Sequence, residues 1–86
     1  MNPNKEDETR QRIAAVRRDI DAIDARILDQ LNERLSLARR IGEYKAAAGH
    51  AIVDKAREDQ MLRALAAWNP GPLANDGLKR IFSEII

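Results

Sequence analysis

Three cations stand in or beside the apolar stripe of one long predicted helix. Arg34 occupies a heptad column otherwise filled by isoleucines, and Lys45 returns to nearly the same face about 16 Å further along the axis. Because burying an unpaired guanidinium is costly, Arg34 needs an anionic partner. Both side chains could converge on one small dianion. Alternatively, Arg34 pairs with an acid of its own fold while Lys45 keeps its charge in water.

Arg17 flanks the same stripe nearer the N-terminus. About 25 Å of helix separates it from Arg34, so the two cannot hold one small molecule within a single chain. If two such helices pack antiparallel, Arg17 of one subunit approaches Arg34 and Lys45 of the other. The alternative is a surface ion pair with Asp21 or Asp24 at helical spacing, which contributes less than about 1 kcal/mol.

A second polar group opens the next predicted helix. Asp54 can accept backbone N–H bonds there, and Arg57 and Glu58 lie one turn on. Exposed N–H groups at this end could also bind a ligand hydroxyl or carboxylate. The alternative is a helix cap beside a surface charge cluster. His50, the single histidine, follows Gly49 without an obvious Ser or Asp partner, so we predict no catalytic role for it.

The apolar stripe belongs to a helix predicted over residues 8–48, which contains no proline and only one internal glycine before the expected C-cap, Gly49. Two heptad columns form the stripe, and all but two of their members are apolar or aromatic. The first column holds Ile13, Ile20, Ile27, Arg34 and Ile41, and the second holds Val16, Ile23, Gln30, Leu37 and Tyr44.

Two shorter helices are predicted to follow. The first is capped by Asp54 and runs to about Trp68, and Asn-Pro-Gly-Pro at residues 69–72 forbids its continuation. Asn75 or Asp76 is expected to cap the last helix, whose apolar face holds Leu78, Ile81, Phe82, Ile85 and Ile86. We therefore predict an all-α domain over residues 8–86, after a disordered polar tail over residues 1–7.

The length of the first helix predicts a homodimer. It would be about 60 Å long, whereas a compact chain of this size has a radius of gyration of about 12 Å. The shorter helices could flank about half of its stripe, so a second chain is expected on the remainder.

Composition excludes several classes of function. The 15 basic and 14 acidic residues nearly cancel, so neither nucleic acid nor a membrane surface is an expected partner. No apolar run approaches the roughly 20 residues that span a bilayer. The chain has no cysteine, which rules out thiolate catalysis and cysteine-ligated metals and is compatible with the cytoplasm, where we expect the protein.

In order and spacing, these residues resemble the all-helical chorismate mutases of the bacterial type, including those fused to prephenate dehydratase. The resemblance covers nearly everything after Ile13. It is carried by residues 16–24, by Asn32-Glu33-Arg34, by residues 41–45 and 54–58, and by residues 69–73 and 81–86.

The resemblance implies three helices per chain in an intertwined homodimer, with each of two sites completed by the partner's first helix. It implies the pericyclic rearrangement of the dianion chorismate to prephenate, in phenylalanine and tyrosine biosynthesis. That step needs no nucleophile, metal or cofactor, and none is expected. The enzyme selects the compact conformer and stabilises charge developing on the ether oxygen.

By position, the resemblance implies a role for each cation of the first helix. Arg34, and Arg17 from the other subunit, would clamp the substrate carboxylates through bidentate bonds. Lys45 would reach the ether oxygen and a carboxylate, which makes it the expected main source of transition-state stabilisation. At the second helix, Asp54 through its backbone and Glu58 would hold the ring hydroxyl. Arg57 would support the carboxylate end.

One departure from the family concerns the third helix. In the family this helix continues beyond the position of Ile86 and contributes a serine and a Gln or Glu to the pocket. Ser83 and Glu84 come about a turn or more too early for those roles. We therefore expect the C-terminal end of this helix to be missing from the 86 residues.

Two other functions stay open at this point. An isochorismate pyruvate lyase would use a similar fold and a similar dianion. A non-catalytic dimerisation or regulatory domain of an aromatic-biosynthesis enzyme would need the helices but not the cations. A helix-turn-helix DNA binder is disfavoured because no helix has a basic recognition face.

Overall fold

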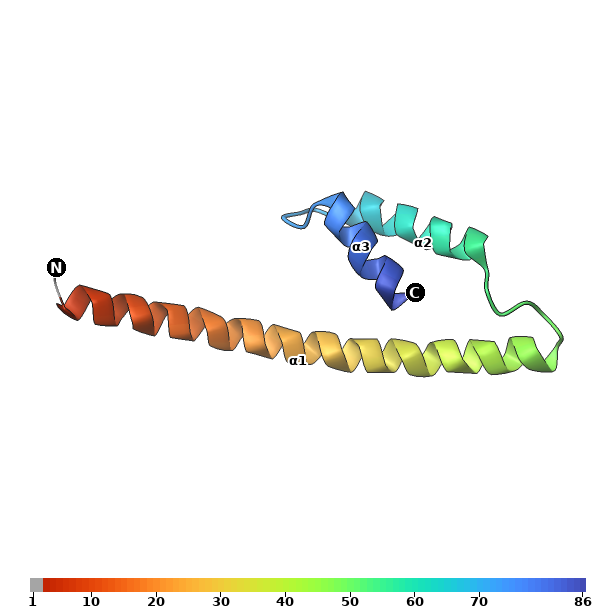
Figure 1. Cartoon of the computed structure of the whole chain (residues 1–86), viewed down its shortest axis with the longest axis horizontal. Coiled ribbons are helices and arrows are strands. Elements are labelled where there is room, and N and C mark those ends of the chain that lie inside the picture. Colours follow the sequence, from red (N-terminus) through yellow and green to blue (C-terminus); the bar gives the residue numbers. More distant parts are fainter. Residues whose placement is uncertain (1–2) are drawn as a thin grey trace. The chain divides into compact units, whose positions relative to one another are not determined.

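The computed structural model describes residues 3–86 as three helices joined by two short connections (Figure 1). They are α1 (Pro3–Ala47), α2 (Lys55–Trp68) and α3 (Asn75–Ile85). The predicted all-α class with one long and two shorter helices is confirmed. The chain divides into two compact units, Met1–Ala38 and Arg39–Ile86, so α2 and α3 belong to the second.

The long helix begins at Pro3, five residues before its predicted start. A proline is tolerated at the first helical position because first-turn N–H groups have no partner inside the helix. Glu6 places a negative charge in the first turn, where the helix dipole favours it. The predicted tail over residues 1–7 therefore overlaps α1 from Pro3 onward, while Met1 and Asn2 lie outside the described residues.

Gly49 ends the long helix as predicted. Its φ of 73° lies in the left-handed region, which favours glycine. The Gly49 N–H donates to the Ala46 carbonyl (3.2 Å), and the His50 N–H donates to the Lys45 carbonyl (2.8 Å). These two bonds form a Schellman motif, which satisfies carbonyls that would otherwise lack a partner at the helix end.

Asp54 caps α2, which confirms the predicted start. Its Oδ1 accepts a hydrogen bond from the Arg57 N–H (3.0 Å), while its carbonyl accepts from the Glu58 N–H (3.1 Å). This is the usual geometry in which a short acidic side chain satisfies an unpaired donor of the first turn.

Replacing Asp54 by alanine should lower the free energy of unfolding by about 1 kcal/mol, because the Arg57 N–H loses its partner. Asp54→Asn is the matched control, since asparagine caps about as well as aspartate. Urea unfolding at a fixed protein concentration measures both. Equal losses in the two variants would contradict a capping role for the side chain.

The predicted caps of α3, Asn75 and Asp76, are wrong. The N-cap position is Ala74, whose side chain makes no capping bond, and Asn75 is already helical. The reason lies in Asn69, whose side chain bridges the turn between α2 and α3. Its Nδ2 donates to the Leu73 carbonyl (2.6 Å) and to Asn75 Oδ1 (3.0 Å), and its Oδ1 accepts from the Gly71 N–H (3.0 Å).

α2 and α3 pack against each other inside the second unit (Figure 1). Leu78 of α3 is the one buried apolar side chain among the described residues, at 5% exposure. A Cβ on Gly77 would lie 3.2 Å from Leu73 Cδ1, so a larger residue there would press on the turn. The hydrophobic core of a single chain is therefore small.

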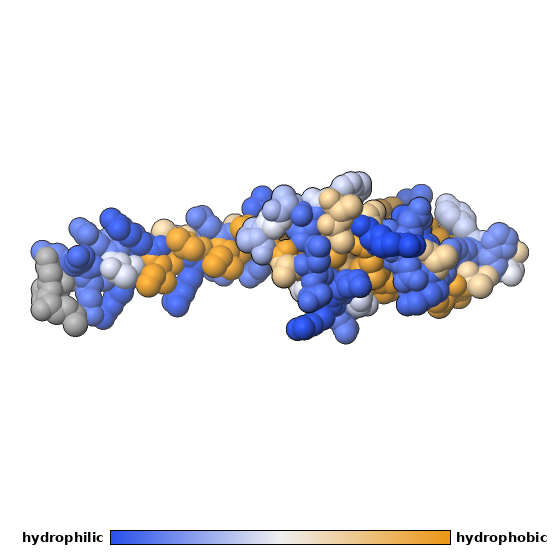
Figure 2. All heavy atoms as spheres, turned by 90° about the horizontal axis from the view of Figure 1, so that it is seen from above, coloured by the Kyte–Doolittle hydropathy of each residue, from blue (hydrophilic) through white to orange (hydrophobic). Residues whose placement is uncertain are grey.

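The apolar stripe of α1 is largely exposed in a single chain. Ile13, Ile20 and Ile27 are 45%, 50% and 51% exposed. Figure 2 shows a band of apolar side chains along the N-terminal part of the helix, bordered by charged groups. Within residues 3–86, no helix is long and apolar enough to cross a membrane.

Candidate functional site

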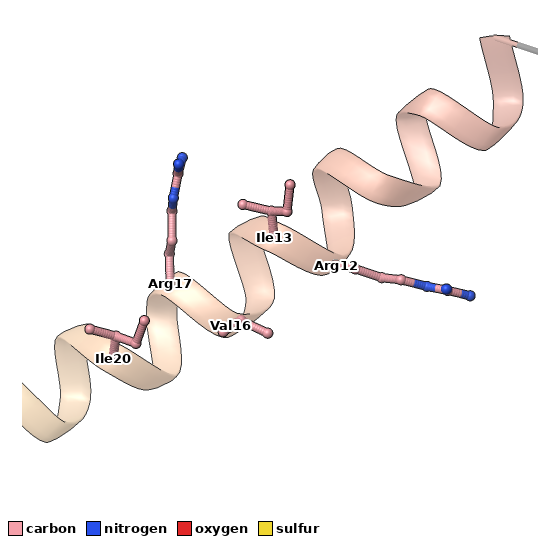
Figure 3. A pocket seen from close by; sticks show the side chains of 5 residues that line it. All are labelled: Arg12, Ile13, Val16, Arg17 and Ile20. Atoms are coloured by element: carbon pink, nitrogen blue, oxygen red, sulfur yellow. The ribbon is translucent and has the colours of Figure 1, made fainter. Parts of the chain in front are cut away.

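Arg17 extends from the apolar side of α1. Figure 3 shows its side chain on the same side as Ile13 and Ile20, whereas Arg12 and Val16 point elsewhere. These five residues line a shallow hollow on the helix surface. Since Arg17 lies four residues after Ile13 and three before Ile20, the helical repeat places it between them. The predicted position of this cation beside the stripe is thus observed.

Arg34 is half-buried, although the residues around it on α1 are exposed. In the part of α1 before residue 40, Ala14 is the only other described residue that is not exposed. The cation that interrupts the isoleucine column is therefore partly withdrawn from water. A guanidinium binds a carboxylate through planar, charge-assisted N–H bonds.

Lys45 is also half-buried and lies in the last turn of α1. The helix dipole favours a cation at this end. The Lys45 carbonyl accepts the His50 N–H, so the backbone that carries the ammonium group is anchored by the C-terminal cap.

The first turn of α2 brings Asp54, Arg57 and Glu58 together. The cap uses the Asp54 carboxylate, the Arg57 N–H, the Asp54 carbonyl and the Glu58 N–H, whereas the Asp54 N–H takes no part in it. Glu58 is half-buried, and Arg57 is exposed. The capping interpretation and the proposed ligand-binding role are compatible, because they use different atoms.

The structure assigns the predicted site residues to both compact units. Arg17 and Arg34 belong to the first, and Lys45, Asp54, Arg57 and Glu58 belong to the second. Sequence reasoning missed Asn69, whose three hydrogen bonds organise the turn after α2. It also missed a shallow hollow on α2 and α3, lined by Asp59, Leu62, Arg63 and Lys79.

A family model and a solved structure define the class of protein to which the chain belongs. Residues 16–86 match the family model described as chorismate mutase type II. A solved structure of chorismate mutase (form II) from Thermus thermophilus superposes with a TM-score of 0.85 and 38% identity, covering 86% of this chain and 84% of that one. The class is thus that of the all-helical mutases, which are isomerases.

The names of curated relatives agree with this class of protein. The bifunctional chorismate mutase/prephenate dehydratase of Neisseria gonorrhoeae (strain ATCC 700825 / FA 1090) is 42% identical over 67 residues, which is 78% of this chain and 18% of that protein. That of Aquifex aeolicus (strain VF5) is 36% identical over 80 residues, or 88% of this chain and 22% of that protein. The chain spans about a fifth of their length.

The chain belongs to the chorismate mutase type II family. This confirms the family predicted from the order and spacing of its residues, together with the isomerase class and the link to aromatic amino acid biosynthesis. The roles of the individual site residues stay predictions.

Proposed function

We propose that this chain converts chorismate to prephenate at two equivalent sites, each shared between the two subunits of a homodimer. The observation that carries the proposal is the half-burial of Arg34 and Lys45 on a helix whose other side chains are mostly exposed. Family membership supplies the reaction class. Each of the two cations offers one positive charge to a dianion, which carries two negative charges.

The reaction is unimolecular, so the site acts by holding a reactive conformer and by stabilising charge. Arg34, together with Arg17 of the other subunit, binds the two carboxylates and keeps the substrate compact. Lys45 donates to the ether oxygen as its bond to the ring breaks. The backbone of Lys45 is held by the cap at the end of α1, where the His50 N–H donates to the Lys45 carbonyl.

The ring hydroxyl is held at the first turn of α2. The Asp54 backbone N–H donates to the hydroxyl oxygen and the carboxylate of half-buried Glu58 accepts from the hydroxyl hydrogen, while Arg57 adds positive charge toward a carboxylate. A hydroxyl held at this point fixes which end of the ring faces Lys45. These contacts are made in both the ground state and the transition state, so they contribute mainly to binding.

The second subunit is part of the proposal for two reasons. Arg17 and Arg34 are about 25 Å apart along one helix, too far to grip one small molecule. The apolar stripe is also about half exposed in a single chain, and such a long apolar strip is expected to be covered. We further propose a cytoplasmic location, with which the absence of cysteine is compatible.

The protein should consume chorismate, which is followed by the loss of chorismate absorbance. The same preparation should release no salicylate from isochorismate. Salicylate from isochorismate without prephenate from chorismate would replace the proposal by a lyase. No turnover of either substrate would leave a dimerisation or regulatory domain as the remaining function.

A further inference from the structure

Three hydrogen bonds close the last turn of α1 around Lys45. The carbonyls of three consecutive residues, with Lys45 in the middle, each accept from an N–H group that lies after the end of the helix. The pairs, donor first, are Ala48 with Tyr44 (3.1 Å), Gly49 with Ala46 (3.2 Å) and His50 with Lys45 (2.8 Å). The last four carbonyls of a helix have no partner inside it, so these bonds hold a turn that would otherwise fray.

Two of these bonds depend on the backbone conformation of Gly49. Its φ of 73° turns the chain back, so that its own N–H and that of His50 point toward the end of the helix. Side chains disfavour this left-handed conformation, which glycine adopts freely and asparagine tolerates. Apart from its chain neighbours, a Cβ on Gly49 would meet no heavy atom within 4 Å. The cost of alanine at this position would therefore come from the backbone conformation alone.

We infer that Gly49 is a positioning residue for the reaction, because it fixes the backbone from which the Lys45 side chain reaches the substrate. The inference rests on the proposed function, in which half-buried Lys45 donates to the ether oxygen. A lysine carries its charge on a flexible four-carbon stem, and that stem searches only the space around its own Cα. If the last turn of α1 frays, the Cα moves, and the ammonium group meets the ether oxygen in fewer conformations.

Gly71 provides a matched control for Gly49. It also has a positive φ, of 76°, and a Cβ there would likewise meet no heavy atom within 4 Å apart from its chain neighbours. Alanine is therefore strained at both positions for the same reason. Gly71 lies in the turn between α2 and α3, which carries none of the proposed site residues. Comparing the two alanine variants separates a loss of stability from a loss of position.

Gly49→Ala should lower kcat for chorismate about 10–100-fold with KM within about threefold of wild type, because a small misplacement of a catalytic group costs that much. Gly71→Ala should lower the urea midpoint by a similar amount but keep kcat within about twofold. Gly49→Asn should keep kcat within about threefold, because asparagine tolerates the left-handed conformation. Wild-type kcat in Gly49→Ala, or equal losses in the two alanine variants, would overturn the inference.

A double variant tests whether Gly49 acts through Lys45. In the Lys45→Ala background, Gly49→Ala should change the residual kcat by less than about threefold, since the ammonium group that it positions is already gone. A role in stability alone would lower kcat by the same factor in both backgrounds. Equal factors would therefore contradict the inference, whereas a factor that disappears with the lysine supports it.

Hydrogen exchange measures the cap without any reference to activity. The His50 amide, which donates to the Lys45 carbonyl, should exchange about tenfold faster or more in Gly49→Ala than in wild type, because alanine disfavours the conformation that closes the cap. In Gly71→Ala its exchange should stay at the wild-type rate. Unchanged exchange of His50 in Gly49→Ala would show that a side chain leaves the cap intact, and the inference would then be wrong.

Turnover by the wild-type chain separates this inference from the proposed function. If wild type converts chorismate and the two alanine variants behave alike, only the positioning role of Gly49 is contradicted. If wild type converts no chorismate, the proposed function is contradicted, and the role of Gly49 in the reaction falls with it.

Discussion

Replacing Lys45 by alanine is expected to lower kcat for chorismate by about 10²–10³-fold while leaving the helical fold in place. In the proposed site this ammonium group stabilises charge that develops only in the transition state, and losing one such donor typically costs that much. The effect should appear in kcat and in kcat/KM alike. Steady-state kinetics with circular dichroism at matched concentration measures turnover and helix content together.

Lys55→Ala is the matched control for Lys45→Ala. Lys55 is exposed, lies in the first turn of α2, and pairs with Asp59 at 3.8 Å across one helical turn. An exposed pair of this kind contributes little to stability, and its loss should leave turnover unchanged. Wild-type turnover by Lys45→Ala, or an equal loss in both variants, would remove Lys45 from the proposed chemistry.

Mixing two inactive variants is expected to restore activity if each site draws on two chains. Arg17→Ala and Arg34→Ala should each be nearly inactive as homodimers, since each removes a carboxylate clamp from both sites. In a mixed dimer, one site receives both alanines and the other receives both arginines. Random exchange of equal amounts makes half of the dimers mixed, so about a quarter of the wild-type activity should return.

A second mixture checks that this recovery comes from sharing. Arg34 and Lys45 come from the same chain in each site. In a mixed dimer of Arg34→Ala and Lys45→Ala, each site therefore still lacks one of the two cations. No recovery is expected there. Recovery in both mixtures, or in neither, would contradict the assignment of Arg17 to the other subunit.

Much of the fold could be predicted because it depends on neighbours in the sequence. Gly49 ends α1 because its position requires a positive φ, and Asp54 begins α2 because its carboxylate reaches the Arg57 N–H three residues on. Both signals act over less than two helical turns. The heptad columns likewise follow from the helical repeat. For the same reason, the place of Arg17 beside the stripe is predictable.

The predictions fail where a local rule has more than one solution. The observed start of α1 is earlier than predicted because a polar segment can be helical or not, and Pro3 is compatible with a first turn. The predicted cap of α3 is wrong because Asn75 pairs with Asn69, six residues earlier, across a turn. Capping preferences say that an asparagine side chain can accept a hydrogen bond from a first-turn N–H. They do not say whether it bonds to that N–H or to another side chain, as Asn75 does with Asn69.

The amino-acid order is enough to specify the three helices, the apolar stripe with its cations, and the family. It also specifies the cap that ends α1 and the cap that begins α2. Those features depend on contacts between residues a few positions apart. Only the folded chain reveals which polar groups lie away from water: Arg34, Lys45 and Glu58 are half-buried, while Arg17 and Arg57 are exposed. Burial follows from the way the folded chain surrounds each side chain, and no local pattern of charges or apolar side chains determines it.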